Sequence, residues 1–278
     1  MLKRIITGAG YVAVMLIVFL LREEIDYRLF HILTMFITVI GTFEMSRAVT
    51  KWADENLSFI SIVFSGLLVP IFLAVEYAFS PENGFKAVLI YLLVAVLLIA
   101  LLCALKKYGF KKFIINVSPF LYPSFFTSFM LYANEMGINK GFIVLLLSFV
   151  IAPLSDTVAY FVGSLIGGKK LCPKLSPKKT WSGAIGGVIG GILGALAVFY
   201  LCKYRIYVKV ESPLWFFIII GGVASILGIF GDLFESFIKR RAGIKDSGKL
   251  LPGHGGVLDR LDSTFFIVVF LSIVFTFV

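Results

Sequence analysis

The sequence has few of the residues that thiol, disulfide or imidazole chemistry needs. It contains three cysteines, Cys103, Cys172 and Cys202, and two histidines, His31 and His254, in 278 residues. The cysteines form no CxxC pair and are odd in number, which argues against a disulfide framework or a zinc knuckle. The histidines lie far apart along the chain, which argues against a His-based metal site.

Charged residues are also scarce. They make up 15% of the chain, whereas 59% of its residues are hydrophobic. Soluble domains are closer to half apolar, and a helix needs about 20 mainly apolar residues to cross a bilayer. The sequence therefore predicts an all-α, polytopic integral membrane protein with about nine transmembrane helices. The predicted spans are residues 5–21, 29–48, 57–79, 87–105, 113–133, 142–166, 183–202, 213–238 and 261–278.

The positive charge is distributed unequally between the two sides of these spans. With this count of spans, 19 of the 26 lysines and arginines fall on the same side as the N-terminus. The excess of Lys and Arg in cytoplasmic loops predicts that the N-terminus is cytosolic and the C-terminus is outside. The same excess of Lys and Arg in cytoplasmic loops accounts for the net charge of +10, so a nucleic-acid partner is not needed to explain this charge.

Ionisable residues inside apolar spans are costly and usually functional. Asp156 lies in the sixth span, on a helical face shared with Tyr160. Asp232, Glu235 and Lys239 follow one another at helical spacing near the end of the eighth span, and Ser236 belongs to the same stripe. A structural alternative stays open for each: a buried carboxylate bonded to a neighbouring helix for Asp156, and an interfacial ion pair of Glu235 with Lys239.

Two loops that are predicted to be cytosolic carry many cations. The loop 167–182 contains SPKKT, in which lysines and hydroxyls could hold phosphate. The loop 239–260 contains PGHGG, whose glycines let a backbone approach a ligand and direct N–H groups at it. The lysines of the first loop have an alternative explanation, because they could serve to keep the loop in the cytosol and to attract anionic lipids.

Five carboxylates are expected to meet at the cytosolic ends of the last four spans: Asp156, Asp232, Asp246, Asp259 and Asp262. Carboxylates without His or Cys suit Mg²⁺. Magnesium with lysines, arginines and a glycine-rich turn indicates phosphoryl or nucleotidyl transfer. A P-loop motif is absent, and no Ser-His-Asp pattern is apparent.

The other spans are expected to serve packing. Glycines recur at spacing four in GAIGGVIGGILGA of the seventh span, which lets helices approach closely. The fifth span holds Asn116, Pro119 and Pro123, so it is expected to be kinked or broken. Residues 1–135 are predicted to provide packing, dimer contact and lipid access, and residues 136–278 to form the catalytic half.

The stretch SFIKRRAGIKDSGKLLPGHGGVLDRLD, residues 236–262, resembles the C-terminal signature of phosphatidate cytidylyltransferases, the CDP-diacylglycerol synthases. The signature contains a Lys-Arg pair, Lys-Asp, Pro-Gly-His-Gly-Gly and Asp-Arg-x-Asp, all present here in this order. Upstream, DTVAY, SPKKT and GDL are similar to the same family. The resemblance is dense over residues 155–263.

This resemblance implies an integral enzyme of the cytoplasmic membrane that faces the cytosol. It would join CTP and phosphatidic acid to give CDP-diacylglycerol and pyrophosphate. It would require a divalent metal, Mg²⁺ with room for a second cation, and would form a homodimer.

The residues that carry the resemblance are assigned as follows. The metal ligands are expected to be Asp232, Asp259 and Asp262, which with Lys239 and Asp156 form the catalytic set. The residues expected to bind the substrates are Ser176, Lys178, Lys179, Thr180, Arg240, Lys245, Asp246, Gly253, His254, Gly255, Gly256 and Arg260.

Three other functions compete with this one. A CTP-dependent lipid kinase of the polyprenol or phytol type would share the nucleotide, the metal and the membrane. An ion-coupled transporter could use intramembrane carboxylates, although paired broken helices in two halves are not apparent. A non-catalytic lipid-binding protein is disfavoured because carboxylates hinder binding of an anionic headgroup unless a metal intervenes.

Overall fold

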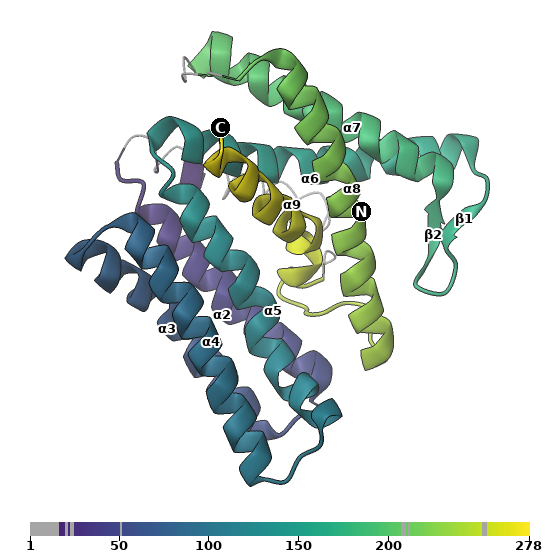
Figure 1. The fold of residues 1–278 in the computed structure, drawn as a ribbon. Helices are drawn as coiled ribbons and strands as arrows, with labels where there is room; N and C mark the ends of the chain where they lie inside the picture. Colours follow the sequence, from purple (N-terminus) through teal and green to yellow (C-terminus); the bar gives the residue numbers. More distant parts are fainter. Residues whose placement is uncertain are drawn as a thin grey trace. The chain divides into compact units, whose positions relative to one another are not determined.

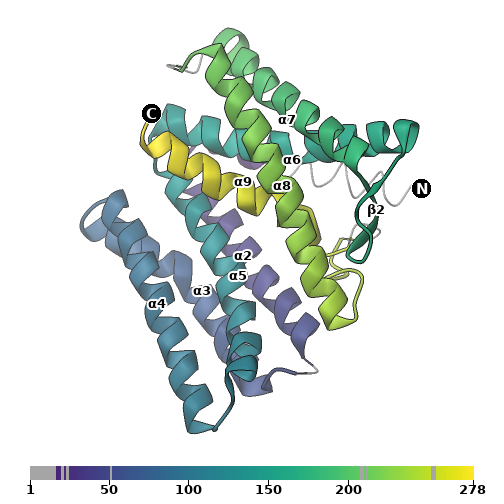
Figure 2. The same cartoon turned by 45° about the vertical axis from the view of Figure 1, so that its right-hand side comes forward.

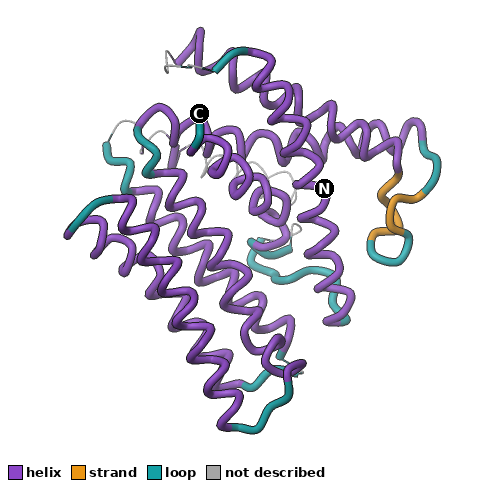
Figure 3. The backbone as a smooth tube through the Cα atoms, in the orientation of Figure 1, coloured by secondary structure: helices purple, strands orange, loops and turns teal. Residues whose placement is uncertain are grey.

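The protein is described by a computed structural model that covers residues 17–19, 22, 25–50, 52–206, 210, 212–251 and 255–278. Helices dominate this part of the chain, with one short hairpin of strands (Figure 3). The elements are α2 (Leu29–Val49), α3 (Glu55–Ala78), α4 (Pro81–Leu105), α5 (Phe110–Asn134), α6 (Ile138–Ile166), β1 (Lys170–Cys172), β2 (Ser176–Thr180), α7 (Trp181–Leu201), the π-helical turn η1 (Cys202–Ile206), α8 (Leu214–Ala242) and α9 (Leu258–Thr276).

The helices confirm an all-α polytopic membrane protein. Within the described residues, seven helices, α2 to α8, are long and apolar enough to cross a membrane. The ninth predicted span corresponds to α9, whose first turns carry Asp259, Arg260 and Asp262. The first predicted span lies outside the described residues except for helical residues 17–19. The orientation of the N-terminus stays a prediction.

The chain divides into two compact units. One comprises Met1–Glu135 with Ile244–Arg260, and the other comprises Met136–Gly243 with Leu261–Val278. The predicted functional division after residue 135 stays a prediction, since packing alone does not test it.

In the first unit, α2, α3, α4 and α5 pack against one another (Figures 1 and 2). Helix α4 contributes Val88, Leu92, Ala95 and Ile99 to the apolar core, at the spacing of one helical face. Its other faces expose apolar side chains such as Leu97. A helix that is apolar on all sides is typical of a membrane span.

Helix α5 is continuous, although it contains Pro119 and Pro123. Of the two outcomes expected for the fifth span, a break is therefore wrong, and a kink stays a prediction. Asn116 explains part of the polarity, because its amide donates to the Lys112 carbonyl at 2.7 Å and its Oδ1 accepts from the backbone N–H of Asp54 at 2.7 Å. A polar residue in this span thus joins α5 to the turn before α3.

In the second unit, α7 packs against both α6 and α8. Glycines make this approach possible: a methyl group at Gly186 would meet Val162 of α6 at 2.6 Å, and one at Gly190 would meet the Leu154 carbonyl at 2.8 Å. Gly191 lies similarly close to α8, where an added methyl would meet the Gly221 carbonyl at 3.0 Å. The packing role predicted for this glycine-rich span is confirmed.

Candidate active site

The SPKKT loop of the second unit folds as a β-hairpin. Strand β1 pairs antiparallel with β2, with Lys170 opposite Thr180 and Cys172 opposite Ser176 (Figure 3). Gly167 and Gly168 precede the hairpin with φ values of 67° and 101°, which favour glycine. The sequence did not reveal these strands because they are short and contain lysines and a proline.

A cavity of about 540 Å³ lies between this hairpin and helices α6, α7 and α8 of the same unit. Six residues predicted to form the site line it: Asp156, Ser176, Lys178, Lys179, Thr180 and Asp232. The predicted face of the sixth span is confirmed, because Tyr160, Gly163 and Gly167 line the cavity together with Asp156. The cavity therefore collects carboxylates, ammonium groups and hydroxyls from segments far apart in the sequence.

Opposite charges meet inside this cavity. Lys179 Nζ lies 2.5 Å from Asp232 Oδ2, and each side chain is 24% exposed. Lys178 and Asp156 are exposed at the cavity wall. Thr180 is buried and caps α7, because its Oγ1 accepts a hydrogen bond from the Gly183 N–H at 3.1 Å. Lys179 thus lies beside a carboxylate, and both lysines line the cavity.

The polar stripe at the end of α8 is also confirmed. Lys239 Nζ lies 3.3 Å from Glu235 Oε1, and Ser236 donates to Asp232 Oδ1 at 3.3 Å. Asp262 of α9 is 8% exposed, and the charges that act on it include those of Glu235, Asp232, Asp156 and Lys239. Four acidic residues from three helices of this unit are therefore electrostatic neighbours.

Arg240, in the last turn of α8, contacts the hairpin. Its Nε donates to the Leu175 carbonyl, in the turn between the two strands, at 3.4 Å. This contact joins the cationic end of α8 to the loop that carries Lys178 and Lys179.

In the first unit, the start of α9 is held by a carboxylate of α2. Glu44 is 3% exposed, and its two oxygens accept from the N–H groups of Val257 and Leu258, each at 3.0 Å. Gly41 lies one turn earlier on α2 and is closely packed. A methyl group added there would lie 3.0 Å from Leu258 and 3.2 Å from Pro123. Helix α2 thus positions the signature segment.

Asp259 organises the loop that precedes α9. Its Oδ2 accepts from the N–H of Ser247 at 2.9 Å and from that of Gly256 at 2.7 Å. Gly255 has a φ of 85°, and a methyl there would meet the Asp259 carboxylate at 2.5 Å. Gly255 of the signature is therefore needed to fold the loop around this carboxylate.

Lys245 and Asp246 border a second cavity of this unit, of about 350 Å³. Both side chains are exposed, and Arg47 and Lys249 line the same cavity. Arg260 is exposed in the first turn of α9. Three cations of the predicted cytosolic side thus line one surface hollow.

The structure therefore distributes the predicted residues over both units. Asp156, the hairpin residues, Asp232, Lys239, Arg240 and Asp262 belong to the second unit, whereas Lys245, Asp246, Gly255, Gly256, Asp259 and Arg260 belong to the first. Gly253 and His254 lie outside the described residues. The expected meeting of all five aspartates stays a prediction.

Glu44 was missed by the sequence analysis, although a signal for it was present. It is an acidic residue inside an otherwise apolar predicted span, the pattern that drew attention to Asp156. What the sequence could not indicate was its partner, because 213 residues separate Glu44 from Val257.

Comparison with known proteins identifies the family. The model of the cytidylyltransferase family matches residues 2–278. The chain belongs to this family. Similar curated relatives of it are named phosphatidate cytidylyltransferase and come from Staphylococcus saprophyticus subsp. saprophyticus at 36% identity, Staphylococcus epidermidis at 41% and Staphylococcus aureus at 40%. Each alignment covers 135 residues, 49% of this chain and 50% of the relative, so the chain matches about half the length of these relatives.

Proposed function

We propose that this chain is a phosphatidate cytidylyltransferase that joins CTP and phosphatidic acid in the membrane. The observation that carries the proposal is the cavity in which Asp156 and Asp232 lie with Lys178, Lys179 and two hydroxyl groups. Membership of the cytidylyltransferase family and the names of the relatives support the same reaction.

The reaction requires little from a general base. A phosphate oxygen of phosphatidic acid would attack the α-phosphorus of CTP, forming a P–O bond while the bond to the β-phosphate breaks and pyrophosphate leaves. Because the attacking oxygen is already anionic near neutral pH, the protein must hold two anions together and stabilise the charge at the α-phosphate. Lys178 and Lys179 supply cations for this at the cavity, and Arg240 supplies one beside the hairpin.

The donor set fits Mg²⁺. The acidic residues that line the cavity offer carboxylate oxygens, and no His or Cys of the described chain is among its lining residues. Asp232 and Asp262 would hold the metal, and it would neutralise charge on the nucleotide phosphates when bound. Mg²⁺ commonly uses one or two carboxylates together with substrate phosphates, so a full cage of protein ligands is not required. Asp259 stays a predicted ligand, with Oδ2 bonded to two backbone N–H groups.

Three finer expectations belong to this proposal. The candidate site faces the cytosol, where CTP and Mg²⁺ are available; the membrane is the cytoplasmic one; and the enzyme forms a homodimer. The charge bias of the loops supports the first. The second and third rest on the family resemblance.

The decisive experiment follows the label of the nucleotide. Purified full chain in detergent is incubated with Mg²⁺, phosphatidic acid and CTP carrying ³²P at either the α- or the γ-position. We expect α-label in the lipid and γ-label in pyrophosphate. A lipid kinase would instead transfer the γ-label to the lipid and leave the α-label in CDP, and the absence of labelled lipid and of pyrophosphate would contradict the proposed reaction.

A variant of the charged pair in the cavity can be compared in this assay with a control variant outside the cavity. Asp232→Asn should abolish formation of CDP-lipid, because it removes both a metal ligand and the partner of Lys179 at 2.5 Å. Glu55→Gln, an exposed residue in the first turn of α3, should leave turnover unchanged. Full turnover by Asp232→Asn would contradict the assigned site.

A further inference from the structure

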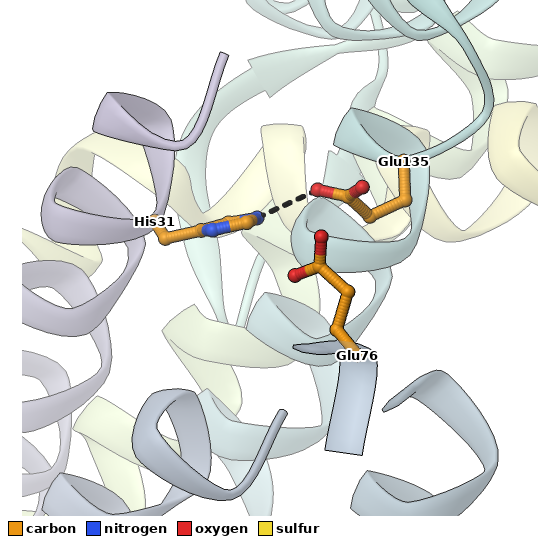
Figure 4. Close-up of side chains that lie close together, drawn as sticks. All are labelled: His31, Glu76 and Glu135. Atoms are coloured by element: carbon orange, nitrogen blue, oxygen red, sulfur yellow. Dashed lines mark ion pairs between the residues drawn. The ribbon is translucent and has the colours of Figure 1, made fainter. Parts of the chain in front are cut away.

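Three side chains that the proposed reaction does not use meet at one end of the helix bundle in the first unit. His31 comes from the first turn of α2, Glu76 from the last turn of α3, and Glu135 directly follows α5 (Figure 4). One potential ligand atom of each residue lies within 4.8 Å of the others, and among the described residues this is the one group of three or more His, Cys, Asp or Glu that does so.

The group is buried. His31 is 1% exposed, and the side chains of Glu135 and Glu76 are 4% and 6% exposed. Two carboxylates at such depth are costly unless charge or hydrogen bonds compensate them. Glu76 Oε1 accepts from the Tyr27 hydroxyl at 3.3 Å and lies 3.9 Å from Arg28 Nε, but Oε2 is buried without a hydrogen-bond donor in the part of the chain that the structure describes. Figure 4 shows this carboxylate directed toward His31 and Glu135.

The spacing of the donor atoms suits a shared cation. His31 Nε2 lies 2.9 Å from Glu135 Oε1. With bonds of about 2.1 Å to a common tetrahedral zinc ion, two such atoms lie about 3.4 Å apart, so His31 Nε2 and Glu135 Oε1 would separate by about 0.5 Å to admit the ion. The imidazole is held by an edge-on contact with Phe72, with ring centroids 5.4 Å apart. Asn134 fixes the segment before Glu135, because its Nδ2 donates to the Tyr27 carbonyl at 3.0 Å and its Oδ1 accepts from Arg22 at 2.8 Å.

We propose that His31, Glu76 and Glu135 bind one divalent cation of the class that accepts imidazole and carboxylate together, with Zn²⁺ as the best match. Three protein ligands leave one position of a tetrahedral ion for water. The cation ties together α2, α3 and α5. The site is separate from the end of α2 that holds α9, since 13 residues at 1.5 Å each place Glu44 about 20 Å along the helix.

The sequence argued against a site built on histidine because the two histidines are far apart. The structure needs only one of them, since the other ligands are glutamates at helix ends, the second of which lies more than a hundred residues after His31. This inference does not rest on the proposed reaction, and its test uses neither CTP nor lipid substrate.

The first test is a binding titration. The full chain, purified in detergent and stripped with EDTA, is titrated with Zn²⁺ in the presence of millimolar Mg²⁺, which competes for carboxylate sites elsewhere. We expect one Zn²⁺ per chain, and Glu76→Gln and Glu135→Gln should each weaken binding by roughly 100-fold or more. The control Glu55→Gln, on the same helix as Glu76 but exposed, should bind as the unchanged chain does. Equal Zn²⁺ affinity in all four proteins would overturn the proposal.

A second test does not depend on whether the cluster variants fold. The chain has two histidines, so His254→Gln leaves His31 as the one imidazole. X-ray absorption of this variant loaded with one Zn²⁺ should show one imidazole and otherwise oxygen ligands. A zinc shell without imidazole, or no stoichiometric zinc, would overturn the site and leave His31 and Glu135 as an ordinary buried ion pair.

Discussion

At the scale of single residues, a carboxylate is well suited to hold the start of a helix. The first N–H groups of a helix have no partner within it, and the helix dipole favours negative charge there. Glu44 of α2 accepts hydrogen bonds from N–H groups at the start of α9. Asp259 accepts hydrogen bonds from N–H groups of the loop before α9. These two carboxylates set the shape of the signature segment.

We therefore expect Glu44→Gln to damage the protein although the side chain keeps its size. The amide offers one acceptor oxygen in place of two, so the N–H of either Val257 or Leu258 loses its bond. A buried unpaired N–H costs about 1–3 kcal/mol. Thermal unfolding in detergent and CDP-lipid formation should both decrease relative to Glu55→Gln. Unchanged stability would show that Glu44 does not hold α9.

At the scale of elements, the second unit depends on close helix approach at particular glycines. A methyl at Gly231 of α8 would lie 2.5 Å from the Asp262 carbonyl and 2.7 Å from Phe266, both on α9. A methyl at Gly222, on the same helix, would have no atom nearer than 3.7 Å. The two positions form a matched pair, because alanine has the same effect on helix propensity at both.

Gly231→Ala should thus separate α8 from α9 and displace Asp232 from Asp262, with loss of most turnover and a lower midpoint of thermal unfolding. Gly222→Ala should retain turnover and change stability by no more than about 1 kcal/mol. Comparing the two by CDP-lipid assay and thermal unfolding tests the packing directly. Similar losses in both variants would contradict the α8–α9 contact as their cause, since alanine favours the helix over glycine at both positions.

The turn before α3 contains an ion pair whose contribution depends on pH. Lys106 Nζ lies 2.6 Å from Asp54 Oδ2 and is the main reason why the pKa of Asp54 is lowered from 3.8 to about 2; the Tyr108 hydroxyl adds a bond at 2.8 Å. Asp54 also caps α3 by accepting from the Leu57 N–H at 3.2 Å. A lowered pKa means that the pair stabilises the folded state above the unfolded pKa and ceases to do so as the carboxyl protonates.

We expect the unchanged chain to be more stable than Asp54→Asn from pH 7 down to about pH 4. The difference should decrease between pH 4 and pH 2 and vanish below it. Because the Lys106 side chain is 37% exposed, solvent screens the pair and the difference should be small. Thermal unfolding across this range measures it, and a difference that persists well below pH 2 would contradict the assignment to ionised Asp54.

Elements and their packing were largely predictable because apolar length and glycine spacing are local properties of the sequence. The spans, the glycine-rich α7 and the stripe of Asp232, Glu235 and Lys239 were all predicted. The hairpin, the continuity of α5, the role of Glu44 and the His31 group were not. The hairpin was missed because its strands are short and contain lysines and a proline. The Glu44 contacts and the His31 group depend on partners far along the chain, which a single sequence does not specify.

At the scale of the whole molecule, the proposal places the hairpin with Lys178 and Lys179 on the cytosolic side. The native cysteines can test this without inserted tags. Cys172 lies half-buried at the end of β1, while Cys103 and Cys202 are 2% and 0% exposed. Thiol reactivity requires access, so Cys172 should be the site that reacts first with a membrane-impermeant maleimide.

We expect labelling in inverted membrane vesicles and none in intact spheroplasts, because the bias of Lys and Arg predicts that the loop after α6 lies inside. Cys172→Ser should abolish the label and identify its site. Labelling of Cys172 in spheroplasts instead would put the hairpin outside, away from CTP and Mg²⁺. The cavity lined by Asp156 and Asp232 would then have no access to its proposed nucleotide, so this one measurement connects the orientation of the chain to its chemistry.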